Sequence, residues 1–133
     1  MLEQADRLKP MVSAAHFYPD RPIDVGHLIG QPMEWRRWGW ARERWSCHIG
    51  DEFGEMAIIA PCDPKGGYGY EIVAEGYGIL PSRFYRAGVT PDEAKLLAEQ
   101  HLRALLAVAN ERFLAFTQSR HMQPVRWIGR DQD

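Results

Sequence analysis

Residues 90–116, TPDEAKLLAEQHLRALLAVANERFLAF, decide the fold because they carry the strongest secondary-structure signal in the chain. Thr90 is suited to cap a helix, Pro91 to open its first turn, and Glu93 to complete a capping box with the threonine. At 100° per residue, the apolar side chains that follow fall on one arc, which predicts an amphipathic helix over 91–116. The arc comprises Ala94, Leu97, Ala98, Leu102, Leu105, Leu106, Val108, Ala109, Phe113 and Phe116.

This helix is longer than the surface it can cover. About 26 residues at 1.5 Å per residue span about 39 Å, whereas a four-stranded sheet is about 15 Å wide. Part of the helix is therefore expected to meet the N-terminal arm, the C-terminal tail or another chain. Leu96 and Leu114 lie about five turns apart on one stripe of the polar side, and we predict a partner or dimer contact there.

Two polar residues, His101 and Arg112, fall inside the apolar arc of the predicted helix. Burying them without partners would be costly, so each is expected to meet a polar group on the sheet. Glu71 and Glu75 are the candidates.

The segment before the helix is expected to form an antiparallel sheet of four or five strands. Apolar and polar residues alternate through several stretches, and clusters of glycine, proline and acidic residues separate them, which is the pattern of a β-meander. The positions predicted to face the helix are Trp45, Cys47, Ile49, Met56, Ile58, Ala60, Tyr68, Tyr70, Ile72 and Ala74.

These elements together predict an α+β fold, in which an antiparallel β-meander packs against one long C-terminal α-helix and an irregular N-terminal arm. A chain of 133 residues suits a single domain. We expect a proline-rich arm over 1–34, which begins with a short helix at 2–9. The sheet follows over 35–90, and a tail over 117–133 follows the helix.

Composition and charge exclude several classes of protein. Apolar residues make up 45% and charged residues 26%, as in ordinary globular proteins, and a net charge of −2 gives no general attraction to nucleic acid. The apolar runs are too short to span a bilayer, and residues 1–6 lack the apolar core of a signal peptide. We therefore expect no membrane association. Cys47 and Cys62, without a secretion signal, predict free thiols in the cytoplasm.

Residues 35–45 contain four of the five tryptophans and four arginines. These residue types dominate binding hot spots, and they also stack on bases and contact phosphates. The other interpretation is a strand whose tryptophans cover the core while its arginines face water. The predicted partner-binding residues are Trp35, Arg36, Arg37, Trp38, Trp40, Arg42, Arg44, Leu96 and Leu114.

The sequence contains few candidates for catalytic or metal-binding residues. His48 lies near Asp51, Glu52, Glu55 and Asp63, residue types that serve in acid–base chemistry and metal binding. Their position around turns is better explained by solvation. The two cysteines fit no zinc signature, and their predicted separation is too large for a disulfide. We predict no catalytic residue, no metal site and no cofactor.

Part of the chain resembles two families of small sheet-and-helix domains. Residues 66–73, GGYGYEIV, followed by residues 90–95, TPDEAK, are similar to the core of HicB-type antitoxins. The start of the helix also resembles double-stranded-RNA-binding domains, which open that helix with lysines that grip phosphate. Here Asp92 and Glu93 occupy the corresponding region and only Lys95 is basic, which argues against binding of double-stranded RNA. Similar small domains occur in prophages and other mobile elements.

The sequence favours a non-enzymatic binding module that acts through a protein–protein surface. The resemblance implies an inhibitor or adaptor encoded by a phage or mobile element, with another protein or a second copy of the chain as its partner. One alternative is a nucleic-acid-binding protein, in which Arg36, Arg37, Arg42, Arg44 and Arg83 converge on one face. A second alternative is a small enzyme that uses His48 and its neighbouring carboxylates in a concave pocket.

Overall fold

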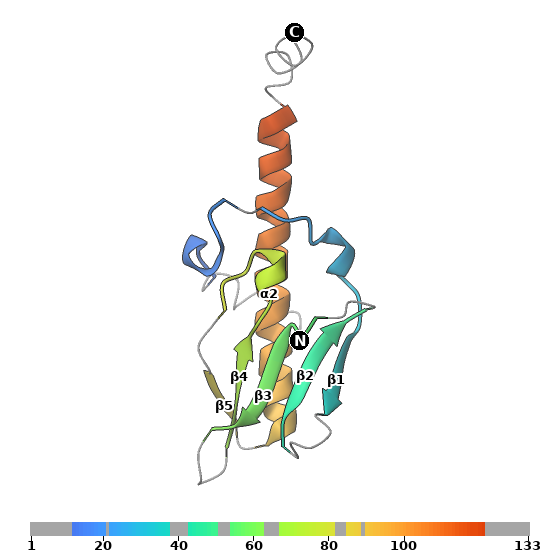
Figure 1. Cartoon of the computed structure of the whole chain (residues 1–133), viewed down its shortest axis with the longest axis vertical. Helices are drawn as coiled ribbons and strands as arrows, with labels where there is room; N and C mark the ends of the chain where they lie inside the picture. The colour runs from blue at the N-terminus through green and yellow to red at the C-terminus, as the bar shows by residue number, and fades with distance from the viewer. Residues whose placement is uncertain are drawn as a thin grey trace.

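The chain forms one antiparallel sheet that lies against a single long helix, α2 (Pro91–His121), and this confirms the predicted α+β class (Figure 1). The helix runs nearly along the strands, packs against β3, β4 and β5, and continues well beyond the sheet. The computed structural model describes residues 12–20, 22–37, 43–50, 54–62, 67–81, 85–88 and 90–121.

The sheet is the predicted meander, because each strand pairs antiparallel with the next one along the chain. The strands are β1 (Met33–Arg37), β2 (Trp45–Ile49), β3 (Ala57–Pro61), β4 (Tyr68–Ile72) and β5 (Tyr85–Gly88). The first strand begins at Met33, slightly before the predicted boundary at residue 35.

The register of the sheet corrects one prediction. Cys47 faces Ala57, and Trp45 faces Ile59, so Ala57 and Ile59 lie on the helix side of β3. We expected Ile58 and Ala60 there. The error arises at Met56, which precedes the strand and whose N–H donates to the Cys47 carbonyl at 2.8 Å. Continuing the alternation from Met56 shifts the phase by one residue, which moves every side chain to the other face.

Strand β4 follows its predicted alternation. Tyr70 and Ile72 are buried and Tyr68 is half-buried against the core. With Cys47 and Ile59 they form the sheet side of a continuous core whose other wall is α2.

The start of α2 is fixed by the predicted capping box. The Glu93 N–H donates to Thr90 Oγ1 at 3.2 Å, and the Thr90 N–H donates back to Glu93 Oε1 at 3.0 Å. The helix then runs for 31 residues, about 46 Å at 1.5 Å per residue. It ends at His121 rather than 116, so residues 117–121 of the predicted tail are helical.

We expect Thr90→Ala to lower the free energy of unfolding by about 1 kcal/mol, because it leaves the Glu93 N–H without its acceptor. Thr117→Ala is the matched control. Its hydroxyl donates to the Leu114 carbonyl at 2.8 Å inside the helix, where such a bond adds little stability. Urea denaturation of both variants measures the difference, and equal losses would show that the cap does not stabilise α2.

The N-terminal arm crosses α2 just beyond the sheet (Figure 1). Two 3₁₀ turns, η2 (Ala14–His16) and η3 (Gly26–Leu28), flank an extended segment that crosses the helix (Figure 1). Phe17, Val25 and Leu28 are buried in the main core. Phe17 also pairs with Ile79, next to another 3₁₀ turn, η4 (Glu75–Tyr77). The predicted short helix at 2–9 lies outside the described residues.

The predicted apolar arc of α2 is confirmed at Ala94, Ala98, Leu102, Leu105, Leu106 and Ala109, all of which are buried. It is wrong at Leu97 and Phe116, which are exposed. Gln100 does not belong to the predicted arc, yet it is only 2% exposed. The prediction of this arc assumed that a single apolar surface covers the helix along its whole length. This assumption fails at Phe116, because the sheet covers only the first part of α2 and different elements surround the rest (Figure 1).

Candidate functional site

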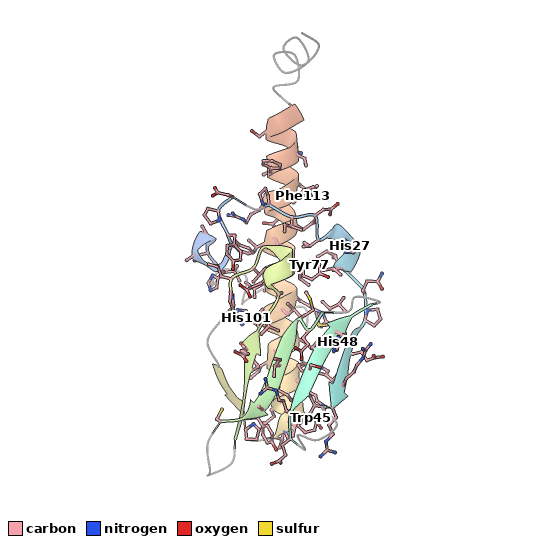
Figure 2. All side chains as sticks on the ribbon, viewed as in Figure 1. His27, Trp45, His48, Tyr77, His101 and Phe113 are labelled. Atoms are coloured by element: carbon pink, nitrogen blue, oxygen red, sulfur yellow. The ribbon has the colours of Figure 1, made fainter. Side chains whose placement is uncertain are left out.

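Some of the tryptophan and arginine side chains of residues 35–45 pack inside the domain. Trp35 is half-buried against the core, and its Nε1–H donates to Glu99 Oε2 of α2 at 2.7 Å. Trp45 lies near the start of α2 (Figure 2) and contacts two cations, with Lys95 Nζ at 4.8 Å and Arg37 Cζ at 5.5 Å from its ring centre. These two tryptophans therefore tie the sheet to the helix.

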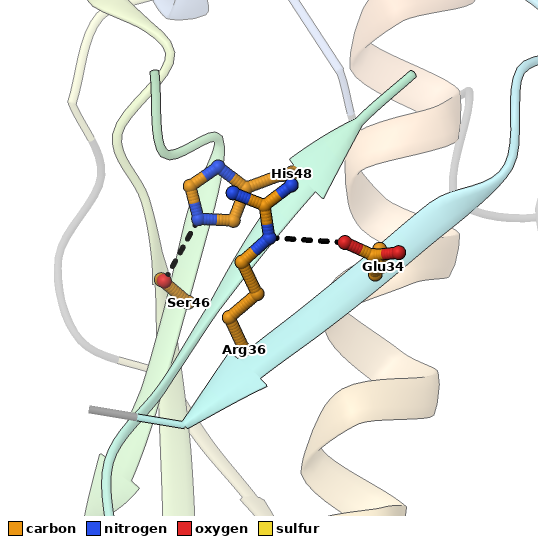
Figure 3. A network of polar contacts seen from close by, with 4 residues as sticks. All are labelled: Glu34, Arg36, Ser46 and His48. Carbon is orange, nitrogen blue, oxygen red and sulfur yellow. Dashed lines mark hydrogen bonds and ion pairs between the residues drawn. The ribbon is translucent and has the colours of Figure 1, made fainter. Parts of the chain in front are cut away.

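The arginines of β1 do not gather on one face. Arg37 lies opposite Trp45 on the helix side, whereas Arg36 is on the other face, ion-paired with Glu34 at 2.9 Å (Figure 3). The nucleic-acid alternative requires Arg36 and Arg37 to converge, and the alternation of the strand separates them. Arg44 is half-buried. Trp38, Trp40, Arg42 and Arg83 lie outside the described residues.

Leu96 and Leu114 lie on the solvent side of α2, with 39% and 50% of their surface exposed. Stepping 100° per residue places Arg103 and Ala107 within about 20° of them. Leu96, Arg103, Ala107 and Leu114 are hereafter called the α2 stripe. Its two leucines are about 27 Å apart along the helix axis at 1.5 Å per residue.

A groove opens at the middle of the α2 stripe, between the helix and the segment that joins η3 to β1. Its volume is about 290 Å³. The lining residues are Leu28, Ile29, Gly30, Gln31, Met33, Arg103, Leu106 and Ala107. Arg103 is the one charged residue among them, so the groove combines an apolar surface with a single positive charge.

His48 forms a hydrogen bond with a serine. Ser46 Oγ and His48 Nε2 are 3.0 Å apart and share a hydrogen bond (Figure 3), and both side chains are buried. Within the described residues Nδ1 of His48 has no hydrogen-bond partner, so no acid orients the ring as in a catalytic triad. Asp51, Glu52 and Asp63 lie outside the described residues. Across those that are described, no three His, Cys, Asp or Glu side chains group to hold a metal.

The cysteines are free thiols, as predicted. Burial raises the pKa of the Cys47 thiol to about 12, and the negative charge of Glu99 contributes in the same direction. Cys47 therefore stays protonated near neutral pH and is not a nucleophile.

The polar residues inside the apolar arc have partners other than the predicted glutamates. His101 Nδ1 and the Tyr70 hydroxyl are 2.8 Å apart and share a hydrogen bond, and the His16 ring lies 6.5 Å from the His101 ring. Arg112 lies over the Phe17 ring at 4.9 Å. Glu75 instead accepts the Tyr18 hydroxyl at 2.7 Å. Residues of the N-terminal arm supply three of these contacts.

Because burial and the nearby His16 lower the pKa of His101, folding stability should depend on pH. The unfolded chain binds this proton at the ordinary pKa of about 6.5, whereas the folded chain binds it only at lower pH. The free energy of unfolding should therefore fall as pH drops below that value, until the folded-state pKa is passed. His101→Gln should reduce this fall.

Urea denaturation between about pH 5 and pH 8, the interval in which histidine titrates, tests the dependence on His101. His27→Gln, a change at an exposed histidine of η3, is the matched variant. Equal pH dependence in wild type and His101→Gln would contradict the assignment to His101.

No protein-family model, curated protein or solved structure matches the chain. The resemblance to HicB-type antitoxins and double-stranded-RNA-binding domains therefore stays a prediction based on the residues quoted above. The described part of the chain contains no helix long and apolar enough to cross a membrane.

The groove is the feature that sequence reasoning missed. Its two walls come from segments about 75 residues apart, and only their tertiary contact creates it. The available signals were the apolar pair Leu28 and Ile29 in the arm, and Arg103 between the two leucines of the predicted stripe.

Proposed function

We propose that the chain is a non-enzymatic binding module that docks another protein along the α2 stripe. The observation that carries the proposal is the exposure of Leu96 and Leu114 on one side of a helix that extends past its own sheet, with the apolar groove between them. Apolar side chains that are exposed on the same side of a protein as a groove are found at protein interaction sites.

The chemistry of the other clusters supports binding over catalysis. Cys47 is protonated, and the ring of His48 lacks an orienting acid among the described residues. The described arginines of β1 lie on opposite faces of the sheet, which favours a protein partner over nucleic acid.

Three narrower proposals follow from the sequence. Free thiols at Cys47 and Cys62 favour a reducing compartment such as the cytoplasm. The resemblance to antitoxin-like domains favours an inhibitor or adaptor encoded by a phage or mobile element. A second copy of the chain is the simplest alternative occupant of the α2 stripe.

The test begins with a tagged full chain used to isolate a partner, which is then purified and titrated against variants of the chain. Leu96→Ser and Leu114→Ser should each weaken binding by about tenfold or more, as expected when a large apolar contact is removed from an interface. Leu97→Ser is the matched control, because Leu97 is also exposed but lies 100° around the helix from Leu96.

Sedimentation of the pure chain distinguishes self-association from binding of a different protein. Equal affinity of the partner for wild type, Leu96→Ser and Leu114→Ser would overturn the proposal, as would the absence of both a partner and a dimer.

A further inference from the structure

The groove at the centre of the α2 stripe has the shape and lining of a pocket for apolar side chains. Leu28 and Leu106 are buried and form its floor, while Met33 and Ala107 are half-buried and Ile29 lies exposed at the rim. A volume of about 290 Å³ is at the lower limit for a small-molecule site. It therefore suits one or two side chains of a peptide better than a large cofactor.

Arg103 gives the groove a positive charge. Its side chain is 41% exposed, and its ion pair with Glu99 Oε1 is long at 4.0 Å. The other oxygen of Glu99 accepts the much shorter bond from Trp35 Nε1 at 2.7 Å, so the carboxylate is held toward the tryptophan. A guanidinium carries five donors, and most of those of Arg103 stay open to a ligand.

The remaining lining residues add no opposing charge. Gln31 is the only other polar side chain among them, and an amide both donates and accepts hydrogen bonds. An incoming carboxylate would thus meet one cation and no anion among the lining residues. A carboxylate–guanidinium pair also has a planar geometry that fixes the ligand's orientation.

We propose that the groove binds an acidic, apolar peptide segment of the partner protein, with a large apolar side chain against Leu28 and Leu106 and a neighbouring carboxylate on Arg103. This inference rests on the proposed function and names the chemistry of the partner. It requires a segment in which Asp, Glu or a C-terminal carboxylate adjoins one or two apolar residues.

The test is selection of random 12-residue peptides, displayed on phage, against the immobilised full chain. We expect enriched peptides to combine an acidic residue with large apolar residues. A synthetic peptide from this set should bind at least about tenfold more tightly than its version with glutamine or asparagine in place of the acid. Its affinity should fall as salt is raised.

Two variants assign the binding to the groove. Arg103→Gln should abolish the preference for the acidic peptide over its amide version, and Ala107→Leu should fill the groove and weaken both peptides by about tenfold or more. Arg36→Gln is the matched control, since it removes the same charge from the opposite face of β1. Urea denaturation of each variant confirms that the fold persists.

The outcomes separate this inference from the proposed function. Enrichment of apolar peptides without acid, enrichment of basic peptides, or no enrichment would overturn it. So would a preference for acid that Arg103→Gln leaves intact. If the isolated partner loses affinity for Leu96→Ser and Leu114→Ser but not for Arg103→Gln or Ala107→Leu, the α2 stripe is a docking surface and the groove is not its acidic pocket. Binding of octanoate as tightly as the peptide would indicate a small-molecule site instead.

Discussion

Replacing Leu102 with alanine should lower the free energy of unfolding by about 3 kcal/mol, within the range of 2–5 kcal/mol typical of buried leucines. Leu102 is fully buried in the core, on the side of α2 that packs against β3, β4 and β5. The truncation removes apolar contact with the sheet and leaves a cavity, and neighbours fixed in strands collapse only partly into it. Because small domains are stable by only about 5–15 kcal/mol, this is a large share of the total.

Leu114→Ala is the matched control, since it makes the same chemical change in the same helix. Leu114 is half exposed, so we expect a loss of about 0.5 kcal/mol or less. Urea denaturation, followed by circular dichroism and by tryptophan fluorescence, measures both variants. Similar losses at the two positions would contradict the assignment of one buried and one exposed side to α2.

The fold was predictable where local chemistry determines structure. The capping box at Thr90 and Glu93 depends on residues three apart, so the sequence alone locates the start of α2. The alternation of Tyr68, Tyr70 and Ile72 in β4 was also predictable, since every second side chain of a strand lies on the same face. At Met56 the same reasoning went wrong, because a residue that precedes a strand can be buried without sharing its alternation.

The helix was less predictable where it leaves the sheet. Periodicity identifies an apolar side only if one surface covers the helix along its length. Phe116 lies in the part beyond the sheet, where the arm supplies the neighbours, and it is exposed despite its place on the arc. Gln100 is the opposite case, since it lies outside the predicted apolar arc and is nevertheless buried. A protein interior can hold an amide side chain when the amide has polar partners.

The candidate site was predictable only in part. The stripe of Leu96 and Leu114 follows from helical geometry, and both residues are exposed as that geometry requires. The groove does not follow from it, because its floor joins Leu28 of the arm to Leu106 of the helix. Packing of the arm on α2 is a tertiary event that no local pattern encodes, yet it forms the pocket and the partners of His101 and Arg112.

This dependence on the arm leads to the second large effect. Phe17→Ala should lower the free energy of unfolding by about 3 kcal/mol, at the lower end of the range for buried phenylalanines. Phe17 is 4% exposed, and its ring lies under Arg112 of α2. Its backbone neighbours bond to the segment after η4, with Tyr18 N–H donating to the Gly78 carbonyl and Leu80 N–H to the His16 carbonyl.

Phe17 therefore anchors the arm against α2, and η3 follows it along the same segment. We expect the truncation to raise amide hydrogen exchange across residues 22–31 and to weaken peptide binding in the groove, because Leu28 forms part of its floor. Phe17→Leu retains most of the apolar volume and should cost less than about 1.5 kcal/mol. If Phe17→Ala lowers stability by less than 1 kcal/mol and leaves exchange over residues 22–31 unchanged, the arm is held by other contacts, and the groove does not depend on this anchor.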